Sequence, residues 1–363
     1  MLQQVKPIDQ PWLAILDHFI DIGTKKAFVV LRVTMDALTK KGKAIQLEDC
    51  ECIGLKISET VNGKSISLEL VEIFGQAGRP TAIIKDCDYT LDKGVRLYTE
   101  KQTVSIPVIE DIGHVMATAL KAQYKDSKGY KSVTELTGQG ASRLRQTNLA
   151  YLIPPKLRTK GRFQSIGKLG QWGAKIVNAL AVKGAAKKGS ILGRLRSALP
   201  GFGQLKPFIL SFARTAKVTS DVMEILKNKG LNHTSHEQCL ELLKNFPRRS
   251  KVKKRLQVWL RRHFAIQQET TCHPLLVSSD IIESLFGRFK QVIERSSHAD
   301  MNRTALLIPA LCGDNDKRMV EQAFREARHK DLELWEEANI PYTMRKKRQL
   351  FFKDKKSQKV GTF

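Results

Sequence analysis

Short apolar runs alternate with patterns of helical period over the first third of the chain. Apolar, β-branched runs predict strands at 12–16, 27–33, 52–57, 81–85 and 105–109. Apolar residues at helical spacing predict helices over 65–74, 91–100 and 112–124, the first of them ended by Gly75, Gly78 and Pro80. Three strands followed by helix, strand, helix, strand and helix indicate an α/β fold, a mixed sheet flanked by helices.

The strand pattern fades after residue 130, where basic, glycine-interrupted helical patterns begin. Helices are expected over 169–182, 191–199, 208–216, 220–228, 236–246 and 251–263, then from about Ser279, and as one long helix over 316–339. We therefore divide the chain into a first core part (1–130), a large, basic, mainly helical insertion (131–271), a closing helical segment of the core (272–313), and a C-terminal helix with a basic tail (314–363).

Three acidic residues occur where the core could bring them together. Asp17 follows the run WLAIL, Asp86 follows TAIIK, and Glu283 lies among apolar residues at helical spacing. A charge in a sheet is costly unless it is compensated, and α/β sheets bind ligands at the carboxyl ends of their strands. Since carboxylates are the ligands that Mg²⁺ prefers, these acids predict a catalytic two-metal site for phosphoryl transfer, with Mg²⁺ as cofactor and Mn²⁺ as a substitute.

Each of these acids has a rival nearby and a plainer interpretation. The rivals are, in chain order, Asp21, Asp88 and Asp280. In the plainer interpretation Asp17 is a strand-end residue facing solvent and Glu283 an ordinary surface residue. Asp92 is expected to cap a helix. Asp111 and His114 are either an N-cap and a partly buried histidine or peripheral members of the site.

The net charge points to a polyanionic partner. Lys and Arg number 62 against 36 Asp and Glu, which leaves a formal charge of +26 spread along the chain; such an excess attracts nucleic acid. No run approaches the roughly 20 apolar residues of a membrane-spanning helix, and no signal-peptide, P-loop or dinucleotide pattern is present. Six cysteines without a paired framework predict reduced thiols. We expect a cytoplasmic protein without a membrane partner or a nucleotide cofactor.

The segment 248–263, RRSKVKKRLQVWLRRH, is the most basic part of the chain and holds no acid. Leu256, Val258, Trp259 and Leu260 predict an apolar stripe opposite a basic face that suits a DNA backbone, although a merely solvated face is the plainer alternative. The basic run 158–206 and the tail 345–363 would add contacts to phosphates. The candidate DNA-binding residues are Arg288, Lys290, Arg248, Arg249, Lys251, Lys253, Lys254, Arg255, Arg261 and Arg262.

Three segments carry a resemblance to a known family. LAILDHFIDIGTKKAFVVL, TAIIKDCDYTLDKGVRLY and SSDIIESLFGRFK, with IPVIEDIGHVMATALK between the last two, resemble the catalytic core of bacterial insertion-sequence DDE transposases. The similarity covers roughly residues 11–313. It implies an RNase H-like fold, Asp17, Asp86 and Glu283 as the three catalytic acids, and a family-typical insertion before Glu283. It also implies hydrolysis and strand transfer at element ends by a homodimer on DNA, in the bacterial cytoplasm and nucleoid.

Two features depart from the family pattern. Many such transposases carry an N-terminal helix-turn-helix domain, whereas this chain begins about ten residues before its first expected strand; either that domain is missing or other parts recognise the DNA ends. On the last helix, Leu276 and Ser279 occupy the Tyr and Arg positions of the subgroup motif, and Lys290 keeps its place after Glu283. The alternatives are a Mg²⁺-dependent RNase H-like nuclease without strand transfer, or a truncated, inactive DNA-binding remnant.

Overall fold

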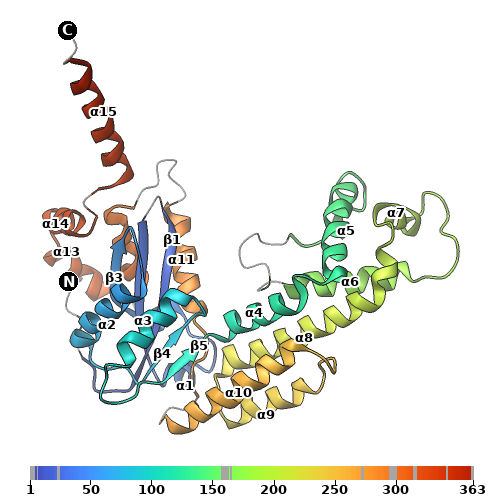
Figure 1. The fold of residues 1–363 in the computed structure, drawn as a ribbon, viewed down its shortest axis with the longest axis horizontal. Coiled ribbons are helices and arrows are strands. Elements are labelled where there is room, and N and C mark those ends of the chain that lie inside the picture. The colour runs from blue at the N-terminus through green and yellow to red at the C-terminus, as the bar shows by residue number, and fades with distance from the viewer. Residues whose placement is uncertain are drawn as a thin grey trace. The chain divides into compact units, whose positions relative to one another are not determined.

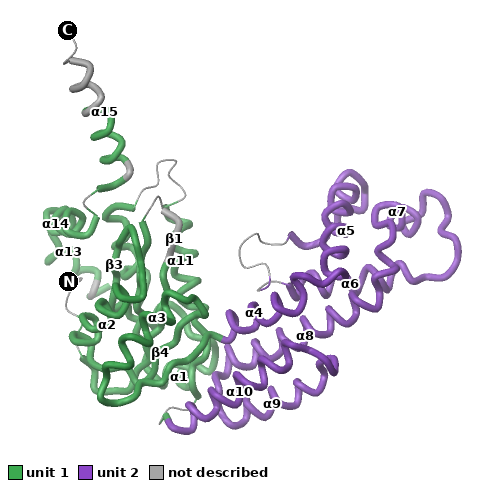
Figure 2. The backbone as a smooth tube through the Cα atoms, viewed as in Figure 1, with its two compact units in different colours: residues 1–111, 270–363 green, residues 112–269 purple. Residues whose placement is uncertain are grey.

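Two compact units make up the chain in the computed structural model (Figure 2): residues 1–111 with 270–363, and residues 112–269. The structure describes residues 5, 7–22, 25–156, 163, 166–270, 274–293, 301–313, 317–340 and 342–360, without the side chains of 19–22, 319, 344 and 354–360. The second unit begins earlier than the insertion expected from the sequence (131–271), because helix α4 (Ile112–Tyr124) packs against α10 (Lys251–Glu269) within it.

A five-stranded mixed sheet forms the centre of the first unit (Figure 1). Its strands are β1 (Trp12–Ile22), β2 (Lys25–Thr34), β3 (Cys50–Ser58), β4 (Ala82–Lys85) and β5 (Val108–Glu110), in the order β3-β2-β1-β4-β5. The pairs β1–β2 and β2–β3 are antiparallel, whereas β1–β4 and β4–β5 are parallel. An antiparallel meander extended by two parallel strands is the arrangement of an RNase H-like sheet, so the predicted fold class is confirmed.

Both faces of this sheet are buried. One face shares a hydrophobic cluster with α2 (Gly63–Ala77) and α3 (Tyr89–Thr99); the strand residues in it are Trp12, Ala14, Leu16, Phe28, Val30, Ile53, Ile83 and Val108. The intervening residues Leu13, Ile15 and Ile84 are also fully buried, and they point to the opposite face because side chains alternate along a strand. Helix α11 (Asp280–Ile293) contacts β1 and lies away from α2 and α3 (Figure 1). The sheet is therefore covered on both sides, as parallel strands require.

The rest of the first unit consists of short helices and the C-terminal helices. One long helix had been predicted over 316–339, and this was wrong: α13 ends at Glu326 and α14 begins at His329. The chain is extended at Arg328, with a φ of −108° and a ψ of 149°, and the Arg328 N–H donates to Asp331 Oδ2 at 3.0 Å. The bounds are α1 (Ala37–Lys41), η1 (Leu47–Asp49), η4 (Arg303–Leu306), α12 (Leu307–Ala310), α13 (Lys317–Glu326), α14 (His329–Asn339) and α15 (Met344–Val360).

Helices connected by loops make up most of the second unit. An aromatic cluster of Tyr124, Tyr130, Phe208 and Phe212 joins three of its helices, with ring centroids 5.0–6.4 Å apart. Its elements are α4, α5 (Lys128–Arg145), η2 (Ala150–Leu152), α6 (Ile166–Leu180), α7 (Ile191–Ala198), η3 (Phe202–Leu205), α8 (Lys206–Lys229), α9 (His233–Leu243) and α10. Among the described helices of both units, none has the length and apolar character needed to cross a bilayer.

Candidate active site

Strands β1 and β4 bring two of the predicted acids to adjacent positions. Their parallel pairing ends with Leu16 opposite Lys85, and Asp17 and Asp86 are the next residues. Leu16 points to the α2–α3 face, and the buried Lys85 does too, since its Nζ lies 2.8 Å from Asp92 Oδ1 on α3. Alternation then directs Asp17 to the opposite face, and Asp86 is the first residue after β4. The two acids therefore occupy neighbouring positions of the backbone, at the carboxyl end of the parallel pair.

Asp17 lies within β1 and not at its end. The strand was predicted to stop at Leu16, but it continues to Ile22 along β2, with Asp17 opposite Val29. The polar residues in the segment DHFIDI interrupt the apolar pattern on which the prediction rested, but the backbone of this segment still pairs with β2. Asp17 is half-buried, and its Oδ1 accepts a hydrogen bond from the His18 N–H at 2.7 Å. The side chain of its rival, Asp21, lies outside the described residues.

The hydrogen bonds of Asp86 and Asp88, the two acids that follow β4, differ. Asp86 is half-buried, and its Oδ1 accepts from the Asp88 N–H at 2.9 Å. Asp88 in turn accepts from the N–H groups of Thr90 and Leu91, at 2.7 and 3.2 Å, and so caps α3. The cap had been expected at Asp92, which instead pairs with Lys85. Asp88 is thus occupied at the helix start, and Asp86 is the acid of this loop that remains a candidate ligand.

Asp111 joins the end of β4 to the start of α11. Its side chain is fully buried, its N–H donates to the Lys85 carbonyl at 2.9 Å, and its Oδ2 accepts from the Ser279 N–H at 2.6 Å. From the sequence, Asp111 could be the cap of the helix that follows it or a peripheral residue of the site. In the structure it accepts a hydrogen bond just before a different helix, α11, from a residue 168 positions later in the chain. His114 is half-buried on α4 in the other unit.

Helix α11 carries Glu283 on the border of its apolar face. The predicted face is confirmed, since Ile282, Leu285, Phe286 and Phe289 are buried. Glu283 is exposed and Lys290 half-buried. A seven-residue step is nearly two turns, so these two side chains project within about 20° of each other.

Arg288 lies on the other border of α11, toward η1. It is exposed, and its charge contributes to lowering the pKa of Glu48, after the larger effects of a backbone hydrogen bond and of Lys41. Arg288 and Lys290, both predicted to contact DNA, therefore project from different sides of the helix.

Asp17 and Asp86 are the acids of the predicted metal site that lie on or next to adjacent strands. Two carboxylates on adjacent strands suit a hard cation such as Mg²⁺, whose remaining ligands are usually water. Glu283 is exposed on α11, and nowhere in the described parts of the chain do three or more His, Cys, Asp or Glu side chains form a group that could hold a metal ion. The role of Asp17, Asp86 and Glu283 as metal ligands therefore stays a prediction.

Helix α10 presents the predicted basic face in the second unit. Leu256, Trp259 and Leu260 are buried as expected, but Val258 is 53% exposed, so its assignment to the apolar stripe was wrong. No acidic residue occurs from 248 to 268. Lys253 is half-buried, and the exposed basic residues are Arg248, Arg249, Lys251, Lys254, Arg255, Arg261 and Arg262. This face has the charge and the exposure that contact with phosphates requires.

Comparison with known proteins gives a distant structural likeness. No family model matches the chain, and no curated protein sequence matches it. Among solved structures it is similar to a chain of the "Drosophila P element transposase strand transfer complex", with a TM-score of 0.48 and 11% sequence identity over 88% of this chain and 81% of that chain. At this TM-score and identity, nothing about the function of the chain follows from the likeness.

Proposed function

We propose that this chain is the core of a DDE-type DNA transposase, which hydrolyses phosphodiester bonds at the ends of an element and joins those ends to target DNA. The observation that carries the proposal is the placement of Asp17 and Asp86 at neighbouring backbone positions, just beyond the paired part of β1 and β4. The three segments that resemble insertion-sequence transposases give the same two acids the same role. The basic face of α10 supports DNA as the substrate.

The acids would act by holding cations and not by transferring protons. Asp17 and Asp86 would be two of the ligands of a pair of Mg²⁺ ions, each with one oxygen oriented by a backbone N–H. Bound Mg²⁺ supplies activation of the attacking oxygen and neutralises charge on the leaving one. Glu283 would be the third ligand, since α11 contacts β1 and the residue before α11, Ser279, is tied by Asp111 to the end of β4. Lys290, on the side of Glu283, would contact a phosphate of the DNA.

The proposal is tested with DNA that carries the sequences flanking the protein's own gene. The purified protein is incubated with this DNA, a supercoiled target and Mg²⁺ or Mn²⁺. We expect cleavage at the element ends and joined products in the target. Cleavage without joining would identify the nuclease alternative instead, and DNA binding without cleavage in either metal would identify an inactive remnant.

Glu283→Gln is the variant that tests the third ligand. We expect cleavage to fall by at least about 100-fold, because a lost metal ligand removes several kcal/mol of charge stabilisation in the transition state. Asp280→Asn is the matched control, an exposed acid of the same helix, and it should cleave within about twofold of the unaltered protein. Mn²⁺ binding, followed by electron paramagnetic resonance, should weaken in Glu283→Gln alone. Equal cleavage by both variants would remove Glu283 from the site.

A further inference from the structure

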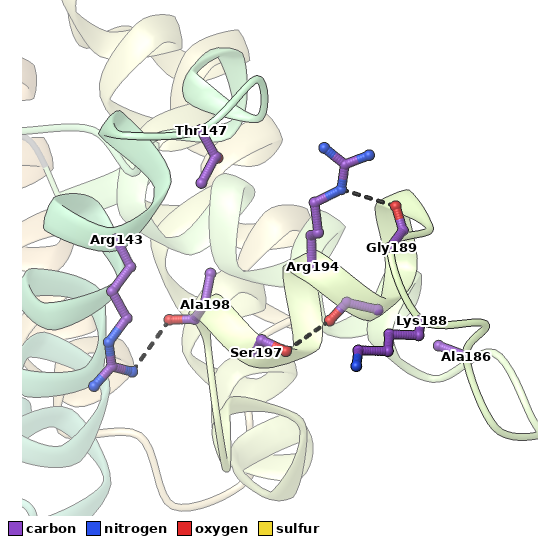
Figure 3. Close-up of a pocket in the computed structure, with 9 residues that line it drawn as sticks. Arg143, Thr147, Ala186, Lys188, Gly189, Arg194, Ser197 and Ala198 are labelled. Atoms are coloured by element: carbon purple, nitrogen blue, oxygen red, sulfur yellow. Dashed lines mark hydrogen bonds between the residues drawn. The ribbon is translucent and has the colours of Figure 1, made fainter.

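A pocket with cationic walls lies between α5 and α7 in the second unit (Figure 3). Its volume is about 490 Å³, and its lining includes Arg143 from α5, Lys188 and Gly189 from the preceding loop of α7, and Arg194 from α7. Arg143 stands on one side and Lys188 and Arg194 on the other (Figure 3). All three basic side chains are exposed. The pocket therefore offers positive charge from two sides to a ligand in solvent.

Neutral groups hold the two arginines in place. Arg194 donates from Nε to the Gly189 carbonyl at 2.9 Å and from Nη1 to Asn148 Oδ1 at 2.7 Å. Arg143 Nη1 donates to the Ala198 carbonyl at 3.5 Å. Such bonds orient a guanidinium without cancelling its charge, so its other N–H groups keep their preference for an anion.

The surrounding chain supplies no negative charge. No Asp or Glu occurs between Leu136 and Ser220. Other lysines of this unit do have acidic partners: Lys131 lies 4.0 Å from Asp126, Lys217 lies 3.0 Å from Asp221, and Lys244 pairs with Glu241. The basic residues of the pocket thus lie in a stretch of sequence without any acid, whereas these three lysines each have an acidic partner. The three paired lysines therefore serve as a matched control.

Glycines shape the walls of the pocket. A Cβ at Gly140 on α5 would overlap the Leu199 side chain, which follows α7. A Cβ at Gly193 would come within 2.9 Å of the Lys187 carbonyl, and Gly189 has a φ of +81°. At Gly140 the tip of the Leu199 side chain would have to shift, whereas Gly193 and Gly189 let the backbone of the loop carrying Lys188 fold back onto α7.

We propose that this pocket binds the sugar-phosphate backbone of duplex DNA, with one phosphate contacting Arg143 and the next contacting Lys188 and Arg194. The choice of DNA rests on the proposed function; the preference for phosphate rests on the pocket itself. Contacts of this kind fix the position of a duplex without reading its sequence. The pocket would hold DNA through the insertion, separately from the acids of the sheet.

The test compares two triple variants of equal charge in the full chain. Arg143→Gln/Lys188→Gln/Arg194→Gln removes the cations of the pocket, and Lys131→Gln/Lys217→Gln/Lys244→Gln removes three paired lysines. Binding to a duplex of arbitrary sequence is measured by fluorescence anisotropy in EDTA over a range of salt concentrations. We expect the slope of log K against log salt to fall by about 2 to 3 in the pocket variant and by less than about 1 in the control. Equal losses in the two variants would overturn the proposal.

Two further variants separate charge from structure. Lys188→Gln changes an exposed loop residue, so it should lower the slope by about 1 with an unaltered circular dichroism melting curve. Arg143→Lys/Arg194→Lys keeps the charge and should keep most of the slope while losing some affinity, because the fork of each guanidinium is lost. An unchanged slope in Lys188→Gln, or a loss confined to RNA duplexes, would contradict the proposal.

The outcomes for the pocket and for the acids are independent. Loss of DNA binding in the pocket variant, in a protein that never cleaves DNA, would support the pocket and reject the transposase assignment. Cleavage by the unaltered protein, with the pocket variant binding like its control, would reject the pocket alone.

Discussion

At the scale of single residues, hydrogen bonds distinguish acids that the sequence cannot separate. Asp86 and Asp88 are two positions apart in KDCDYT, and both were candidates. The structure makes Asp88 the cap of α3 and leaves Asp86 at the backbone position next to Asp17. The positions of Asp17 and Asp86 could be predicted because both follow apolar runs. The bond from Ser279 to Asp111 could not, because it joins residues 168 positions apart and neither shows a local pattern.

Asp111→Ala should loosen the start of α11. The change leaves the buried Ser279 N–H without its acceptor, which costs about 1.5–3 kcal/mol for a bond to a charged group. Hydrogen exchange of the peptide 280–293 should accelerate accordingly. Glu100→Ala is the control, since it removes an exposed acid 3.9 Å from Arg96 and should change stability by less than about 0.5 kcal/mol. Exchange in α11 that stays as slow as in the control would show that Asp111 does not hold this helix start.

Cys87, next to Asp86, should react slowly with alkylating reagents at neutral pH. Although the residue is exposed, the protein around its thiol partly excludes water and raises the pKa to about 11, and the neighbouring Glu110 carboxylate adds to the effect. Since the thiolate is the nucleophile, the rate should rise about tenfold for each pH unit up to pH 10 and level off only near 11. Mass spectrometry of the Cys87 peptide measures the rate against free N-acetylcysteine. A plateau near pH 9 would contradict the assigned environment.

At the scale of elements, the spacing of apolar residues predicted the limits of helices best where those residues face a hydrophobic core. The limits of α4 agree with those predicted, 112–124. Two helices predicted at 208–216 and 220–228 are one, α8, because Thr215 and Thr219 donate their hydroxyls to the carbonyls four residues earlier and so remain within the helix. Helix α5 was not predicted, since its glycines weaken the pattern and only tertiary packing, as at Gly140, explains them.

Neighbouring residues of α10 should respond very differently to truncation. Trp259 is 1% exposed and Val258 53% exposed. Trp259→Ala should lower the free energy of unfolding by about 3–5 kcal/mol through the cavity it leaves, whereas Val258→Ala should change it by no more than about 0.5 kcal/mol. Urea unfolding of the two variants, side by side, measures the difference. Similar losses in both would mean that α10 does not bury the face assigned to it.

At the scale of the whole molecule, the sequence predicted a sheet-based core and a helical insertion but not where they divide. Helix α4 has the strong period of a core helix, yet it packs with α10 in the second unit. The order of the strands in the sheet could not be predicted from the sequence either. The alternation of strands and helices indicates a mixed sheet, whereas the pairing of β1 with β4, which makes Asp17 and Asp86 neighbours, depends on contacts between distant segments.

The most direct test of the proposed site is the rate of Mg²⁺-dependent DNA cleavage in two Asp-to-Asn variants. Asp86→Asn replaces a proposed metal ligand, whereas Asp88→Asn replaces a helix cap with a residue that caps equally well. We predict that Asp86→Asn loses cleavage by at least about 100-fold while still binding DNA, and that Asp88→Asn cleaves within about twofold of the unaltered protein. Full Mg²⁺-dependent cleavage by Asp86→Asn would contradict the account.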